Sequence, residues 1–165
     1  MNAKSQSQDR EAGEKNLIRT MAGLAALGLA VSAYLTTVHY SSVPLVCLGT
    51  TGCEEVNRSV FSEVAGVAVA LLGSGAYLVI LLTLWTESLD ILKAQEAVLG
   101  QFGVSLAGAL YSAYLTYVEL AILRAVCVWC VISALAVVGV LALSIVRLRR
   151  LVAAEAAPSG RARRR

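Results

Sequence analysis

Apolar residues gather in long blocks along the chain, and charged residues are confined between those blocks. Four blocks carry no charged side chain, at residues 20–38, 64–86, 97–118 and 125–146. Each block is close to the roughly 20 residues that a helix needs to cross about 30 Å of hydrocarbon. Because lipid offers no hydrogen-bonding partner to a bare backbone amide, each block should be helical. The pattern therefore predicts an all-α integral membrane protein, built as a bundle of four transmembrane helices.

The composition agrees with a membrane protein of one domain. The 165 residues are 58% hydrophobic and 15% charged, whereas soluble domains carry roughly a quarter charged residues. We expect a tail at 1–16, a membrane domain at 17–147 and a basic tail at 148–165. Within the domain, the helices are expected at about 17–38, 64–86, 97–118 and 125–147.

The long outer loop, 39–63, is expected to contain a short amphipathic helix. Segment 54–64 has one apolar stripe at helical spacing, formed by Val56, Val60, Phe61 and Val64. Such a helix lies in the membrane interface with its apolar face buried. The alternative is a simple connecting turn that leads into the second transmembrane helix.

The basic residues predict the orientation. Of the 14 lysines and arginines, all but Arg58 and Arg124 lie in the two tails, directly beside them, or in the loop after the second helix. The positive-inside rule therefore places both tails in the cytoplasm and the loops 39–63 and 119–124 outside. The C-terminal sequence RARRR is expected to lie near anionic lipid rather than to bind nucleic acid.

All four cysteines fall on the predicted outer side, where thiols can be oxidised. Cys127 and Cys130 form the sequence CVWC. Two intervening residues place their sulfur atoms one helical turn apart on the same face. At a helix start, the dipole lowers the thiol pKa and favours the reactive thiolate. This is the arrangement of thiol–disulfide exchange catalysts.

The other two cysteines, Cys47 and Cys53, lie in the loop sequence CLGTTGC. Gly49 and Gly52 predict a flexible segment, so this dithiol can visit two partners in turn. One alternative is a non-catalytic membrane subunit in which both pairs are static structural disulfides. A zinc site is another, although the spacing of the four cysteines is poor for one.

One short stretch occurs twice. Residues 32–39 read SAYLTTVH and residues 112–119 read SAYLTYVE, and each stretch precedes a cysteine. The first and third helices run in the same direction, so both copies lie near the outer third of the membrane. Tyr34 and Tyr114 occupy equivalent positions and are candidates to line a pocket below the cysteines. The alternative is that both belong to the aromatic belt at the membrane interface.

The last positions of the repeat, His39 and Glu119, are polar. His39 is the one histidine of the chain, and it could handle protons or simply lie at the interface. The role of Glu119 stays open. A small transporter is a further alternative. The four apolar blocks contain no charged residue, however, and such residues usually mark an ion or proton path through a bundle.

These features resemble the vitamin K epoxide reductase (VKOR) family in its bacterial form. The resemblance rests on four spans, a Cys-x5-Cys loop, and CVWC opening the fourth helix, together with SAYLTTVHY, CEEVNRS, GVAVALLGSGAY and YLTYVEL. The disulfide-bond-forming protein B type also has four helices and four outer cysteines. There the Cys-x-x-Cys pair comes first, whereas here it comes second.

The resemblance implies a quinone-dependent thiol oxidase of the bacterial cytoplasmic membrane. Such an enzyme reoxidises a secreted thioredoxin-fold, DsbA-like partner and passes the electrons to ubiquinone or menaquinone. By motif, Cys47 and Cys53 exchange with the partner, and Cys53 then exchanges with Cys127. Cys130 would face the quinone. No metal, flavin or haem is expected, because no motif for such a group occurs.

Further residues follow from the same resemblance. Ser59 matches a serine near the family's active site, and the quinone pocket is expected to include Ser59, Tyr34, Tyr114 and Ala134. Ala134 stands where the animal enzymes have tyrosine, so reduction of vitamin K epoxide is not implied. Ala68 lies in a region where many bacterial members have proline. A fused thioredoxin-like domain is not expected, so the partner would be a separate protein.

Overall fold

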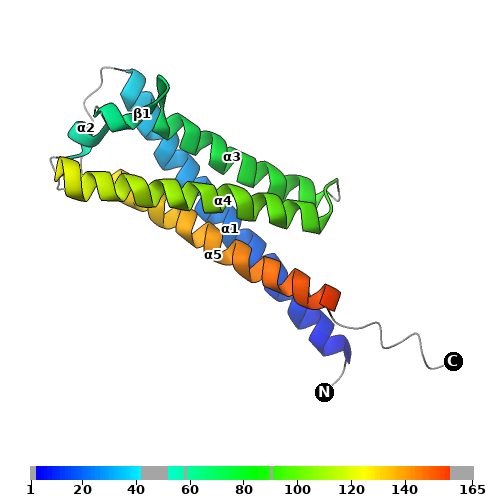
Figure 1. Ribbon diagram of the computed structural model, residues 1–165. Helices are drawn as coiled ribbons and strands as arrows, with labels where there is room; N and C mark the ends of the chain where they lie inside the picture. Colours follow the sequence, from blue (N-terminus) through cyan, green and yellow to red (C-terminus); the bar gives the residue numbers. More distant parts are fainter. Residues whose placement is uncertain (1–2, 42–51, 58, 90, 157–165) are drawn as a thin grey trace.

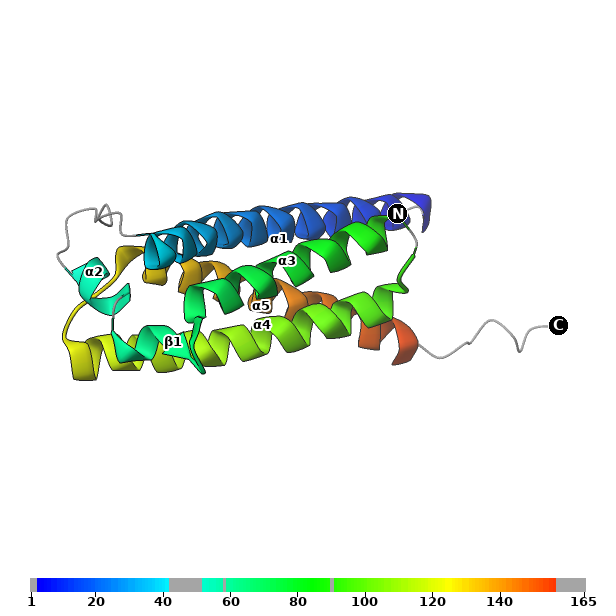
Figure 2. The ribbon, with the colours of Figure 1, turned by 90° about the horizontal axis from the view of Figure 1, so that it is seen from above.

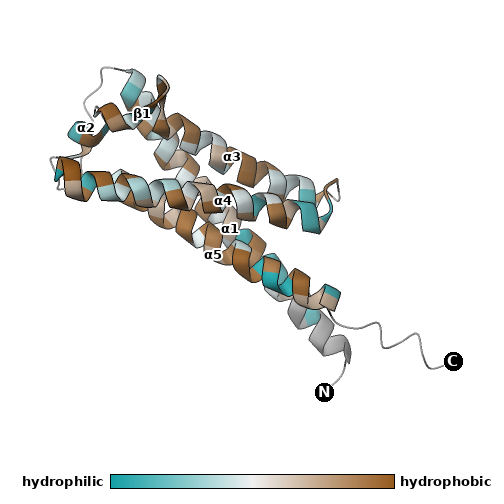
Figure 3. Cartoon of the chain, viewed as in Figure 1, coloured by the Kyte–Doolittle hydropathy of each residue, from teal (hydrophilic) through white to brown (hydrophobic). Residues whose placement is uncertain are grey.

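Four long helices form a bundle in the computed structural model, which describes residues 3–41, 52–57, 59–89 and 91–156. The helices are α1 (Ala3–Tyr40), α3 (Val69–Ser88), α4 (Ala94–Tyr117) and α5 (Val128–Ala156). All four are long and apolar enough to cross a membrane, which confirms the predicted fold class. Figure 3 shows apolar residues along the helices and hydrophilic ones gathered towards their ends.

The bundle consists of two helix pairs, α1 with α3 and α4 with α5, and α1 and α5 contact each other between the pairs. Helix α1 packs against α3 and α5, while α4 packs against α5 and α3. The start of α1 and the end of α5 lie at one end of the bundle, and the short elements α2 and β1 lie at the other (Figures 1 and 2). Successive long helices run in opposite directions, so after four of them the chain returns to the end of the bundle where it began.

Close packing of α1 against α3 depends on Gly28. A Cβ atom at Gly28 would lie 2.2 Å from Cζ of Tyr77, so only glycine admits the tyrosine ring here. The Tyr77 hydroxyl donates a hydrogen bond of 2.6 Å to the carbonyl oxygen of Ser133 on α5. One buried side chain therefore connects three of the four helices.

The short elements between α1 and α3 form a cap over one end of the bundle. They are α2 (Gly52–Asn57), the 3-10 turn η1 (Val60–Ser62), and the antiparallel strands β1 (Glu63–Val64) and β2 (Val67–Ala68). The single helix expected over 54–64 is therefore shorter, because it ends at Asn57. The second long helix also begins later than its apolar block.

Local hydrogen bonds explain why the cap is not one helix. The Ser59 hydroxyl donates to the Val56 carbonyl at 2.8 Å, and the Ser62 hydroxyl donates to the Ser59 carbonyl at 2.7 Å. Serine bonds of this kind compete with helical backbone bonds. Ala65 and Gly66 then adopt positive φ angles of 53° and 78°, which reverse the chain between β1 and β2.

His39 fastens this cap to the end of α1. Its Nδ1 atom lies 3.0 Å from the carbonyl oxygen of Asn57, and its Nε2 atom lies 3.0 Å from Oε1 of Glu63. One imidazole therefore contacts both the end of α2 and the start of β1.

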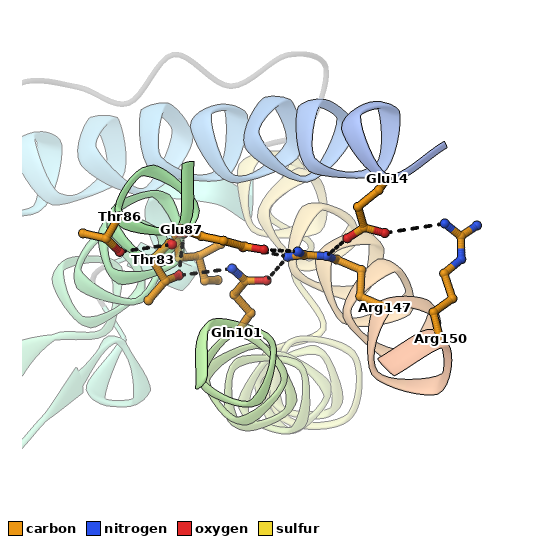
Figure 4. A network of polar contacts seen from close by, with 8 residues as sticks. Glu14, Thr83, Thr86, Glu87, Gln101, Arg147 and Arg150 are labelled. Atoms are coloured by element: carbon orange, nitrogen blue, oxygen red, sulfur yellow. Dashed lines mark hydrogen bonds and ion pairs between the residues drawn. The ribbon is translucent and has the colours of Figure 1, made fainter. Parts of the chain in front are cut away.

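At the opposite end, a buried arginine joins all four helices (Figure 4). Arg147 is only 3% exposed, and its Nε donates to Glu14 Oε1 at 2.7 Å. Its Nη1 donates to Gln101 Oε1 at 2.8 Å, and its guanidinium pairs with Glu87. Gln101 reaches Thr83 in turn, at 3.5 Å. Such a charge is tolerated because every partner is present.

Replacing Arg147 with alanine should strongly destabilise the bundle. The change leaves Glu87 and Gln101 without their buried partner, and breaking a buried ion pair costs about 3–5 kcal/mol. Arg150→Ala is the matched control, because Arg150 is half exposed and lies 3.6 Å from Glu14, a pair worth about 1 kcal/mol or less. The free energy of unfolding in detergent measures both effects. Equal losses would contradict the assignment of Arg147 as the central contact.

Candidate active site

Two cysteines from distant parts of the chain meet beneath the cap. Cys53 on α2 and Cys127 at the start of α5 are both fully buried, and they belong to one apolar cluster. The thiol of Cys53 is a hydrogen-bonding neighbour of the Cys127 sulfur. The fourth cysteine, Cys47, lies outside the described residues. The contact places one thiol of each predicted pair next to the other.

Gly52 makes this approach possible. A Cβ atom at Gly52 would lie 2.9 Å from the backbone nitrogen of Val126 and 3.0 Å from Cβ of Ala125. Contacts that short are too close for an added carbon atom, so α2 can press against this segment only with glycine. The sequence predicted flexibility at Gly52, and the structure shows a close-packing requirement there.

Cys127 and Cys130 open α5 as their spacing predicts. Cys127 directly precedes the first residue of α5, and the backbone N–H of Cys130 donates to its sulfur at 3.4 Å. The hydrogen bond from the Cys130 side chain is the main cause that lowers the pKa of Cys127, from an ordinary 9.0 to about 7. The Cys130 backbone and Cys53 act in the same direction, while burial and the charge of Glu119 oppose them. A large thiolate fraction near neutral pH follows.

Glu119 holds the segment that leads into this pair. It lies in η2 (Val118–Leu123), a π-helix that continues α4. Its carbonyl oxygen accepts the N–H of Ala125 at 3.1 Å, and its Oε2 atom accepts the N–H of Cys127 at 3.2 Å. Arg124 adopts a left-handed conformation with φ 50° between these contacts. Sequence reasoning left the role of Glu119 open, although the repeat had drawn attention to its position.

A cavity of about 300 Å³ lies beside Cys130, within the bundle. Its lining is mainly apolar and comes from the cap and from all four long helices. Ser59 and Ala134, two of the four predicted pocket residues, line it together with Cys130 and Glu119. Ser133 and Tyr77 also line it, and neither was among the predicted pocket residues.

The two predicted tyrosines lie elsewhere. Among the described residues that line the cavity, neither Tyr34 nor Tyr114 occurs. The Tyr34 ring packs against Trp129 with centroids 5.2 Å apart, and the Tyr114 ring packs against Tyr111 at 5.9 Å. Tyr114 is 49% exposed on the bundle surface, where an aromatic belt would place it.

No cluster of three or more histidine, cysteine, aspartate or glutamate side chains is arranged to hold a metal ion in the part of the chain that the structure describes.

A membrane bundle that holds a reactive thiol pair against a third buried cysteine defines a membrane oxidoreductase acting on thiols. The family model described as the Vitamin K epoxide reductase family matches residues 19–145. The match covers most of the chain, and the protein belongs to this family. It is therefore a multi-pass membrane oxidoreductase of a disulfide-bond-forming family, whose members use quinones and work with thiol partners.

Gly52→Ala should slow exchange between Cys53 and Cys127. Overpacking of this kind costs about 1–3 kcal/mol, which corresponds to a slowing of about 5- to 150-fold if the whole cost falls on the exchange step. The rate at which a small disulfide such as oxidised glutathione converts the two thiols to a Cys53–Cys127 disulfide, in a Cys47→Ala and Cys130→Ala background, measures it. Gly75→Ala on α3 is the control, because no heavy atom lies within 4 Å of its added Cβ. An unchanged rate in Gly52→Ala would show that the close approach is not required.

The Cys127 thiolate should form with a midpoint near pH 7 in the reduced protein. It is present above that pH and lost as the pH falls through it. Cys130→Ala removes the principal hydrogen bond and should move the midpoint up towards 9.0. Cys130→Ser keeps a donor and should move it less. The carbon chemical shift of labelled Cys127 follows the titration, and identical midpoints in the alanine and serine variants would refute the hydrogen-bond cause.

Proposed function

We propose that this protein is a quinone-dependent thiol oxidase. A separate thioredoxin-fold, DsbA-like partner gives two electrons to the Cys47–Cys53 disulfide. The reduced loop pair passes them to the Cys127–Cys130 disulfide, and that pair passes them to ubiquinone or menaquinone in the membrane. The net result is a disulfide in the partner and a quinol in the bilayer.

One observation carries the proposal: Cys127 contacts Cys53 on one side and Cys130 on the other, and Cys130 lines the cavity. A thiol pair that passes electrons between two sites needs one sulfur at each site. The burial of Cys53 and Cys127 also supports a controlled exchange, because it keeps the thiols of other proteins from their sulfur atoms.

The chemistry of exchange fits this order. Cys53 thiolate attacks the Cys127 sulfur, forming a Cys53–Cys127 bond and releasing Cys130 as a thiolate. Cys47 then attacks Cys53, which restores the loop disulfide and releases Cys127. Thiols of low pKa leave faster, so the lowered pKa of Cys127 favours the second step.

The cavity is suited to a quinone ring. Its volume, about 300 Å³, is at the lower limit of the range usual for small-molecule pockets. The apolar lining suits a lipid-soluble ring, while Cys130 supplies electrons and Ser59, Ser133 and Glu119 supply polar atoms. The quinone itself supplies a two-electron, two-proton acceptor.

We place the membrane domain at 17–147 in a bacterial cytoplasmic membrane. Both tails would be cytoplasmic and the four cysteines would be on the outer side. The supporting observation is that, among the described residues, lysine and arginine lie mostly at the end of the bundle remote from Cys53 and Cys127.

Purified protein in detergent should reduce a quinone when supplied with a reduced thioredoxin-fold donor. The loss of quinone absorbance measures the rate, with ubiquinone and menaquinone analogues tested separately. Cys130→Ala should abolish turnover, because the thiol beside the cavity is gone.

Cys47→Ala serves as the matched variant in the same assay. It should lose turnover with the protein donor but retain part of it with dithiothreitol, which can reduce the Cys127–Cys130 pair directly. No turnover with either quinone, with all four cysteines remaining oxidised, would instead support a membrane subunit with structural disulfides.

A further inference from the structure

We propose that Glu119 is the catalytic proton carrier between Cys130 and the quinone. This inference rests on the proposed function, because it assigns a residue to the last electron-transfer step. It concerns a buried carboxyl group that the cysteine relay by itself does not use.

Glu119 lies at the point where the thiol pair meets the cavity. Its carboxyl group is bound to the backbone N–H of Cys127 at 3.2 Å and interacts with the side chain of Cys130. Glu119 and Cys130 both line the cavity. The carboxyl oxygens are therefore in reach of both the donor thiol and a ring held beside it.

No basic side chain neutralises this carboxyl group among the described residues. Glu119 is only 5% exposed, yet it has no ion-pair partner there. The titratable groups that face this region are Cys53 from α2, Tyr77 from α3, Tyr111 from α4, and Cys127 and Cys130 from α5. All are neutral or anionic, so no cation fixes the Glu119 carboxyl group in its charged form, and the group can take up a proton.

The backbone conformation around Glu119 directs its side chain towards the start of α5. The π-helix η2 replaces the regular end of α4, and such elements occur frequently at functional sites. The turn through Arg124 and Ala125 folds back onto the Glu119 carbonyl, with the Ala125 N–H bound at 3.1 Å. The side chain is thereby directed at the start of α5 instead of at lipid.

Oxidation of the Cys127–Cys130 pair requires that the Cys130 thiol lose its proton. Glu119 carboxylate accepts the proton of the Cys130 thiol, and the two sulfur atoms then form the Cys127–Cys130 disulfide. The two electrons released reduce the quinone to the quinol. One quinol proton comes from Glu119. The other is taken up from water, which had received the Cys127 proton when that thiol became a thiolate. The carboxylate is regenerated for the next cycle.

A purely structural role for Glu119 makes a different prediction. In that case the carboxylate only accepts the Cys127 N–H, as an uncharged amide oxygen also can. Glu119→Gln retains this acceptor at the same position but cannot carry a proton. Glu119→Ala removes both functions. The pair of variants therefore separates proton transfer from backbone support.

The experiment measures two rates in the full-length protein, in detergent. One is quinone turnover as a function of pH, and the other is reduction of the Cys127–Cys130 disulfide by dithiothreitol. Glu119→Gln should lower quinone turnover by about 100-fold or more, the usual contribution of a general acid or base. Disulfide reduction should stay at the wild-type rate. The residual turnover should rise with pH, because Cys130 must then lose its proton to hydroxide.

The control variant is Glu96→Gln, which alters an exposed carboxyl in the first turn of α4 and should behave as wild type. Full turnover in Glu119→Gln with loss in Glu119→Ala would overturn the proposal in favour of backbone support. A fall in both rates in Glu119→Gln would also overturn it. Absence of quinone turnover in the wild-type protein would remove the proposed function as well, so the two failures are distinguishable.

Discussion

The contact between α2 and the turn before α5 is the constraint on which the chemistry of this protein depends. Without it, Cys53 and Cys127 are on separate segments that the membrane alone does not bring together. Gly52 admits the approach, because any side chain there would strike Ala125 and Val126. The transmembrane helices provide a stable platform, but this short helix of six residues decides whether two thiols can exchange.

The repeated stretch has a structural counterpart at its last position. His39 closes the first copy and contacts Asn57 and Glu63, so it holds the cap. Glu119 closes the second copy and binds the Cys127 N–H, so it holds the start of α5. Both side chains extend from the end of a long helix to a cysteine-bearing region. The repeat therefore marks the two points where the bundle positions its outer segments.

The helices and the thiol pair could be predicted from the sequence because each follows from a local rule. Bilayer thickness sets the length of an apolar block, and two intervening residues set the spacing of Cys127 and Cys130. The residues that line the pocket could not be predicted in the same way. Periodicity gives the direction of Tyr34 or Tyr114 around its own helix axis, but not which face meets a neighbour. The cap departs from prediction because serine hydrogen bonds and the positive φ angle of Ala65 interrupt its helix.

The two ends of the bundle treat buried charge in opposite ways. Arg147 is surrounded by Glu14, Glu87 and Gln101, so its charge and hydrogen-bond donors are matched (Figure 4). Glu119 is nearly as buried, but the described residues around it offer a backbone N–H and thiols instead of a cation. A buried carboxylate without a counter-charge costs free energy. Departures of this kind from stable packing concentrate at functional sites, and this one lies where a thiol must release its proton.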